Sequence, residues 1–168
     1  MTQDNVTICE VGPRDGLQMA QGIMPTALKR RWIGALAAAG VPEIEVGSFV
    51  PASLLPQMAD TAEIVAASCQ LGPVIVALAP NLRGVQAAVA AGAHRITIPV
   101  SVSDGHSRAN VRRGTMEQIE AVAAIVTWAR DAAPHTPIEA ACSTAFGCSI
   151  DGAVPLLRLL EVADALAR

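Results

Sequence analysis

Strand-like and helix-like segments alternate along the whole chain, and this alternation restricts the fold more than any other feature. Short runs rich in Val and Ile predict buried strands, and each is followed by an alanine- and leucine-rich segment with helical spacing. The predicted strands are Val6–Val11, Glu43–Val46, Val74–Leu78, Arg95–Val100 and Ile138–Cys142. The predicted helices are Thr26–Ala39, Thr61–Ser68, Leu82–Ala91, Met116–Ala132 and Ala153–Ala167. Five strand–helix units indicate a parallel α/β fold, with residues 1–168 in a single domain.

Residues that favour helix boundaries support this pattern. Asn81 is suited to begin one helix, and Thr115 with Gln118 is suited to begin the next. Gly40 and Gly92 stand where a helix would end in a left-handed residue, and a strand follows each of them within three residues. This repeated helix–glycine–strand connection is typical of parallel α/β proteins.

Two parallel architectures remain open. A doubly wound sheet usually carries a glycine fingerprint after its first strand, whereas Gly12-Pro13-Arg14-Asp15-Gly16 lacks the G-x-G-x-x-G spacing. A closed TIM barrel needs eight units and about 250 residues. The chain therefore predicts a partial TIM barrel with about five of the eight (β/α) units.

Composition excludes several classes of partner. The net charge is −3 and aromatic residues make up 2% of the chain, so no basic or base-stacking surface for nucleic acid is expected. No apolar run is long enough to cross a bilayer, and Met1–Asn5 is polar without a signal-peptide profile. We therefore expect a cytoplasmic protein with neither nucleic acid nor membrane as a partner.

The four cysteines form no CxxC pair and predict reduced thiols rather than disulfides or a zinc site. We expect Cys9 and Cys69 to be buried. Cys142 ends the last predicted strand, and Cys148 lies in the Ser- and Gly-rich segment after it; both are candidates for a role next to a site.

The segment Glu10-Val11-Gly12-Pro13-Arg14-Asp15-Gly16-Leu17-Gln18 is the most informative motif. It places Arg14 and Asp15 just past the first strand, in a turn that two glycines and a proline constrain. A cation and a carboxylate at the C-terminal end of a barrel strand are suited to metal-assisted carbonyl chemistry. The local sequence also allows a structural ion pair.

Further blocks accompany this motif in a fixed order. They are Ser48-Phe49-Val50, Pro56-Gln57-Met58-Ala59-Asp60, Pro80-Asn81-Leu82-Arg83-Gly84, Ala87-Ala88-Val89-Ala90-Ala91-Gly92-Ala93 and Ser143-Thr144-Ala145-Phe146-Gly147-Cys148. Together they resemble the 3-hydroxy-3-methylglutaryl-CoA (HMG-CoA) lyases, within a wider family of metal-dependent lyase and aldolase TIM barrels. Condensing relatives usually have Thr-Leu before Arg-Asp-Gly, so Gly12-Pro13 favours the lyase branch.

The resemblance implies an activity and a set of roles. The reaction is the cleavage of HMG-CoA, an acyl-CoA of leucine degradation, to acetyl-CoA and acetoacetate. Asp15 matches a ligand to Mg²⁺ or Mn²⁺, and Arg14 matches the arginine that stabilises the enolate. Glu45 matches an active-site acid, and Gln18 and Ser143 match substrate-binding positions.

The resemblance also implies ligands that this chain does not carry. The family's His-x-His pair and an Asn belong to later strands, and His94, His106 and His135 do not have that spacing. We therefore expect weak metal binding, little activity from this chain by itself, and either a homo-oligomer or a complementing C-terminal half. Two alternatives remain, a non-catalytic or oligomerising fragment and an aldolase or synthase acting on keto-acids.

Three further expectations concern individual side chains. We expect Glu43 to be solvated and to face the opposite side of its strand from Glu45. Lys29-Arg30-Arg31 is expected to be a solvated face of the first helix. The segment Ser101–Asn110 is expected to be a loop on the active-site side, with His106 as a candidate substrate contact.

Overall fold

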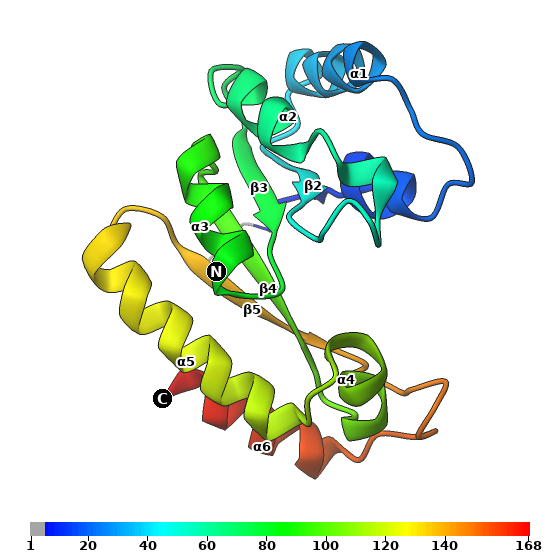
Figure 1. The fold of residues 1–168 in the computed structure, drawn as a ribbon, viewed down its shortest axis with the longest axis vertical. Coiled ribbons are helices and arrows are strands. Elements are labelled where there is room, and N and C mark those ends of the chain that lie inside the picture. Colours follow the sequence, from blue (N-terminus) through cyan, green and yellow to red (C-terminus); the bar gives the residue numbers. More distant parts are fainter. Residues whose placement is uncertain (1–5) are drawn as a thin grey trace, which may run out of the picture.

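Five parallel strands form one curved sheet in which spatial order follows chain order (Figure 1). The computed structural model describes residues 6–168, so the expected polar N-terminus at residues 1–5 lies outside the described residues. The strands are β1 (Cys9–Glu10), β2 (Glu43–Ser48), β3 (Val74–Leu78), β4 (Arg95–Ser101) and β5 (Ile138–Ser143). Each strand pairs in parallel with the next one along the chain. This sequential order is that of a TIM barrel and not of a doubly wound sheet.

A helix follows every strand, and the major helices cover the outer side of the sheet (Figure 1). The helices are α1 (Thr26–Ala38), α2 (Thr61–Ser68), α3 (Leu82–Ala91), α4 (Asp104–Val111), α5 (Thr115–Ala132) and α6 (Leu156–Ala167). Two short helical turns, η1 (Gly12–Gly16) and η2 (Pro56–Met58), follow β1 and β2. The described residues thus form five units of a (β/α)8 barrel, which confirms the predicted partial barrel.

The hydrophobic core lies between the sheet and the outer helices. Strand residues that point outward are fully or almost fully buried, among them Ile44, Ile75, Ile96 and Ile98. They pack with aliphatic side chains of the helices, including Ile33, Ile64, Val85, Ile119 and Val162. Burial of this apolar area is the main force that holds the helices on the sheet.

The inner face of the sheet is polar, and here one expectation was wrong. Glu43 and Glu45 both line a cavity on this face. Side chains of a strand alternate with a period of two, so residues two positions apart face the same side. Glu43 is therefore an interior residue and not a solvated one, and it lies 2.9 Å from Arg95.

Several element boundaries also differ from the prediction. β1 is only two residues long, because its single neighbour, β2, offers register partners to Cys9 and Glu10 alone. The predicted loop at Ser101–Asn110 instead contains α4. Helix α6 begins three residues later than predicted, directly after Pro155.

The predicted helix start at Asn81 and the predicted helix ends at Gly40 and Gly92 are confirmed, whereas the predicted Thr115–Gln118 capping pair of α5 is wrong. Asn81 Oδ1 accepts a hydrogen bond from the Gly84 N–H, and Gly40 and Gly92 have left-handed backbones with φ of 81° and 89°. Helix α5 does not use Gln118 for capping. The Glu117 carboxylate accepts from the Gly114 N–H at 2.6 Å, and Gln118 turns into the structure to contact β4.

The sheet that residues 6–168 form is open, with β1 and β5 at its edges. Apolar side chains are exposed near both edges: Val6 and Ile8 before β1, and Phe146, Leu156 and Leu157 after β5. No helix in the described part of the chain is both long and apolar enough to cross a membrane.

Candidate active site

The turn after β1 is built by its own backbone. In η1 the N–H groups of Arg14 and Asp15 both donate to the Val11 carbonyl. The Gly12 N–H donates to the Glu10 carboxylate at 2.6 Å, and a Cβ on Gly12 would lie 2.8 Å from that carboxylate and 3.2 Å from the Trp32 ring. Glycine therefore permits this close approach, whereas a larger residue would displace the Glu10 carboxylate and press on the Trp32 ring. The result is a constrained turn, as predicted, with Arg14 and Asp15 at the C-terminal end of β1.

Arg14 joins two carboxylates. Its Nε donates to Glu45 Oε2 at 2.6 Å, and its Nη1 donates to Asp15 Oδ1 at 2.8 Å. The Arg14 side chain is 15% exposed and that of Glu45 is 4% exposed, whereas that of Asp15 is 55% exposed. A guanidinium thus lies at the strand ends with one buried and one accessible acidic neighbour.

Glu45 is a buried acid whose charge is only partly compensated. Burial raises the pKa of the Glu45 carboxyl above its ordinary value, although the Arg14 guanidinium acts in the opposite direction. A β-bulge follows directly, because the register with β3 shifts between Glu45 and Gly47. Bulges of this kind re-aim side chains next to active sites.

Arg14 and Glu45 open onto a cavity of about 500 Å³ on the inner side of the sheet. Below them, Arg95 Nη1 lies 2.9 Å from the Glu43 carboxylate and 4.0 Å from that of Glu139. Cys9 also lines this cavity and is exposed, so the expectation of a buried thiol was wrong for this residue. The interior of the described half-barrel is therefore a layer of alternating charges.

Within residues 6–168, the side chains of the other two predicted site residues, Gln18 and Ser143, make no hydrogen bond or ion pair with this cluster. Gln18 is half-buried and lies just past η1, and Ser143 ends β5 on the strand's inward-facing side. Ser143 pairs in register with Ser101 of β4. Both residues lie at the C-terminal ends of the strands, on the same side of the half-barrel as Arg14.

The loops after β4 and β5 form a hydrogen-bonded cluster. Asp151 Oδ2 accepts from Ser103 Oγ at 2.6 Å and from the Gly105 N–H at 2.8 Å. The Cys148 sulfur is buried and lies 3.1 Å from Ser103 Oγ. Thr144, with a strained φ of 60°, accepts from the Ser103 N–H. Cys148 is therefore part of a loop network at this end of the sheet, whereas sequence reasoning missed Asp151.

A buried cation also escaped the sequence analysis. Lys29 is 2% exposed and not part of a solvated face. Its Nζ lies 2.6 Å from Asp60 Oδ1 and 2.5 Å from the Gln57 carbonyl oxygen, and the Gln57 side chain donates to the Ala20 carbonyl. The Lys29–Asp60 pair fastens helix α1 to the loop after β2, and the Gln57–Ala20 hydrogen bond fastens that loop to the loop after β1. The helical spacing could have predicted that Lys29 is buried. Lys29 lies four residues before Ile33 in α1, so both side chains lie on the same, buried face of the helix.

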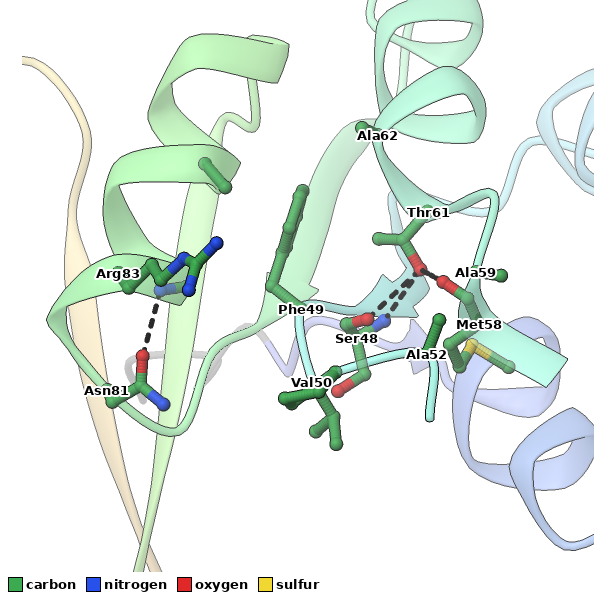
Figure 2. A pocket seen from close by; sticks show the side chains of 13 residues that line it. Ser48, Phe49, Val50, Ala52, Met58, Ala59, Thr61, Ala62, Asn81 and Arg83 are labelled. Atoms are coloured by element: carbon green, nitrogen blue, oxygen red, sulfur yellow. Dashed lines mark hydrogen bonds between the residues drawn. The ribbon is translucent and has the colours of Figure 1, made fainter. Parts of the chain in front are cut away.

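A second cavity, of about 300 Å³, lies between α2 and α3 on the outer side (Figure 2). Phe49, Met58 and several alanines line it, and Arg83 stands at its rim. Thr61 Oγ1 contacts both the N–H and the carbonyl oxygen of Ser48 here, at 3.2 and 3.1 Å. This cavity does not include Arg14 or Glu45, so we do not assign the chemistry to it.

The described residues offer a metal ion one accessible ligand at this site. Asp15 Oδ1 accepts a hydrogen bond from Arg14, and the Asp15 side chain is 55% exposed. No group of three or more His, Cys, Asp or Glu side chains within residues 6–168 is arranged to hold a metal. The carboxylate suits a hard cation such as Mg²⁺ as a single oxygen ligand.

A half-barrel with an arginine–carboxylate cluster at its strand ends defines a class, that of TIM-barrel enzymes with the site at the C-terminal face. A family model described as HMGL-like matches residues 5–168, and the chain belongs to this family.

Similar proteins agree with this assignment. The chain is 38% identical to the mitochondrial hydroxymethylglutaryl-CoA lyase of Gallus gallus, over 94% of this chain and 52% of that protein. It is 38% identical to the cytoplasmic 3-hydroxy-3-methylglutaryl-CoA lyase of Rattus norvegicus, over 96% of this chain and 47% of that protein. The chain thus spans about half the length of these relatives.

Solved structures give the same picture. The HMG-CoA lyase of Bacillus subtilis superimposes with a TM-score of 0.91 at 31% identity, over 98% of this chain and 55% of that one. The HMG-CoA lyase of Acinetobacter baumannii, solved with coenzyme A and 3-methylmalate, gives a TM-score of 0.89 at 29% identity, over 96% and 52%.

Proposed function

We propose that the protein carrying this chain cleaves HMG-CoA to acetyl-CoA and acetoacetate. The contact between Arg14 and Glu45 at the C-terminal strand ends carries the proposal, together with membership of the HMGL-like family. Cleavage breaks the bond between the α- and β-carbons of the thioester: the β-hydroxyl loses its proton to a base and becomes the ketone of acetoacetate. The electron pair of the broken bond places negative charge on the enolate oxygen of acetyl-CoA, and this enolate is then protonated at carbon. A guanidinium fixed near that oxygen lowers the barrier, typically by several kcal/mol.

In this proposal each residue of the cluster has one task. Arg14 faces the developing enolate oxygen. Glu45, whose pKa burial raises, holds the guanidinium at 2.6 Å and keeps it from turning to solvent. Gln18 and Ser143 bind polar groups of the substrate from opposite sides of the mouth.

Asp15 is proposed as one oxygen ligand of Mg²⁺ or Mn²⁺. When bound, the cation supplies Lewis-acid polarisation of the substrate oxygens. The remaining ligands would come from barrel units outside these residues. Calorimetric titration of Mn²⁺ tests this part, since tight stoichiometric binding to the 168-residue chain by itself would contradict the shared-ligand proposal.

The central experiment measures products. HMG-CoA is incubated with the protein and Mg²⁺, and acetoacetate and acetyl-CoA are quantified, with pyruvate release from keto-acids measured in parallel. Acetoacetate release supports the lyase. Pyruvate release would instead assign the chain to the aldolase or synthase alternative, and neither product would favour a non-catalytic role.

The open edges at β1 and β5, with exposed Val6, Ile8 and Leu157, favour association with a further barrel half or a second copy. Light scattering of the 168-residue chain should therefore show an oligomer, and a stable monomer would contradict this. Because the rat relative is a cytoplasmic enzyme by name, we also propose a cytoplasmic location, which imaging of a tagged protein tests.

A further inference from the structure

A serine and a histidine lie side by side at the end of β4. Ser101 follows Arg95 and Thr97 at even spacing along β4, and both of those residues line the inner cavity, so the Ser101 side chain faces the same way. Ser101 Oγ lies 2.8 Å from His106 Nδ1. Ser101 also pairs in register with Ser143. The Ser101–His106 pair is therefore at the C-terminal mouth, where barrel enzymes bind their substrates.

The histidine is held from two sides. Its backbone N–H donates to Ser103 Oγ at 3.1 Å, and Ser103 in turn donates to Asp151. Asp151 also accepts from the N–H of Gly105. Two loops therefore fix the backbone at His106, and Ser101 fixes its ring. A side chain held in this way is preorganised for binding.

The remaining ring nitrogen is available. Within residues 6–168, His106 Nε2 has no hydrogen-bond partner, and the residue is half-buried. When Ser101 donates to Nδ1, Nε2 carries the hydrogen and becomes a donor. Asp104 and Asp151 flank this part of α4, and their negative charges disfavour another carboxylate there. An uncharged carbonyl oxygen fits the position best.

We propose that His106, oriented by Ser101, binds the substrate by donating a hydrogen bond from Nε2 to a carbonyl oxygen of the acyl-CoA thioester or of its pantetheine arm. The proposal rests on the proposed function and adds a residue to its site. His106 contributes binding in the ground state and the transition state alike, so its removal changes KM more than kcat.

The kinetic test compares three variants with wild type in HMG-CoA cleavage. H106F removes the donor and should raise KM about tenfold, the equivalent of about 1.4 kcal/mol, with kcat within about twofold. H106Q keeps an N–H donor of similar reach and should restore KM to within about threefold. H135Q is the control, because His135 is exposed in the loop before β5, at the opposite end of the sheet. An unchanged KM in H106F overturns the proposal.

A binding test separates this proposal from the proposed function. Histidine ring signals are followed by NMR while acetyl-CoA, which has the same thioester and pantetheine carbonyls, is added to the wild-type protein. A shift of the His106 signal with a constant His135 signal supports the contact, even if HMG-CoA is not cleaved. Binding of acetyl-CoA without a shift at His106 overturns it, and so does a failure to bind.

Discussion

Arg14 and Glu45 lie 31 residues apart in the chain and 2.6 Å apart in the structure. The contact links the turn after β1 to the inner face of β2. Both side chains are largely removed from solvent, so Glu45 depends on Arg14 for charge compensation, while Arg14 also pairs with Asp15. The same contact holds the guanidinium at the C-terminal ends of the strands, and the proposed chemistry depends on it.

Removal of Arg14 should affect both stability and activity. R14M leaves the buried Glu45 carboxylate without its partner and should lower the free energy of unfolding by about 3 kcal/mol. The double variant R14M/E45L should recover most of that loss, because it removes both charges. Lyase activity should fall at least 100-fold in both variants, since neither retains the cation that stabilises the enolate. Urea unfolding and acetoacetate release measure the two effects, and an active double variant would contradict the role of Arg14.

Glu45 should make stability depend on pH. Its pKa in the folded protein is raised above the ordinary 4.5, so its contribution is fully present below pH 4.5 and is lost as the pH rises through the folded value. In E45Q this fall should disappear. Urea unfolding between pH 4 and pH 8, compared between wild type and E45Q, measures the difference. Identical pH profiles would show that burial does not raise the pKa of Glu45.

Lys29 should be important for stability. K29M removes a buried cation from Asp60 and from the Gln57 carbonyl, and we expect a loss of about 3 kcal/mol in the free energy of unfolding. R30A is the matched control, because Arg30 is the next residue of α1 and its 3.9 Å pair with Glu63 is exposed on both sides. Its loss should stay below about 0.5 kcal/mol. Equal effects in thermal or urea unfolding would mean that the burial of Lys29 has no energetic consequence.

Substitution by alanine should lower the stability of the protein at Gly47 and raise it at Gly34. A Cβ on Gly47 would lie 2.6 Å from Thr61 Oγ1, and backbone contacts of that hydroxyl hold Thr61 in place. G47A should therefore cost about 1–3 kcal/mol. Gly34 lies inside α1 with open space around it, so G34A should stabilise by about 0.5–1 kcal/mol. Chemical unfolding of both variants measures these changes in the free energy of unfolding. An unchanged value in G47A would show that β2 and α2 can move apart at little energetic cost.

The fold could be predicted from local patterns, and the errors have identifiable causes. Aliphatic runs such as Val74–Leu78 and the glycines at helix ends located the units well, because these signals depend on residues close in sequence. The predicted strand at Val6–Val11 shrank to two residues, since strand length depends on what the neighbouring strand offers. The polar segment at Ser101–Asn110 formed a helix through the Ser103 cap and its tie to Asp151, which is 48 residues away.

The candidate site was also predicted only in part: features set by neighbouring residues were found, and contacts between distant segments were not. The motif around Arg14 and Asp15 identified the turn, because glycine and proline restrict a backbone locally. The inward direction of Glu43 followed from strand alternation but was misjudged. The contact of Lys29 with Asp60 joins two segments 31 residues apart in the chain, and no local pattern encodes such a contact.

The amino-acid sequence by itself determined the alternation of strands and helices, the constrained turn after β1 and the family. Each of these depends on patterns of residues that are close together in the chain. Only the tertiary structure decided which charges are buried and which are paired. Those properties depend on the packing of distant segments, which sets the distances and the local solvation that govern electrostatic energies.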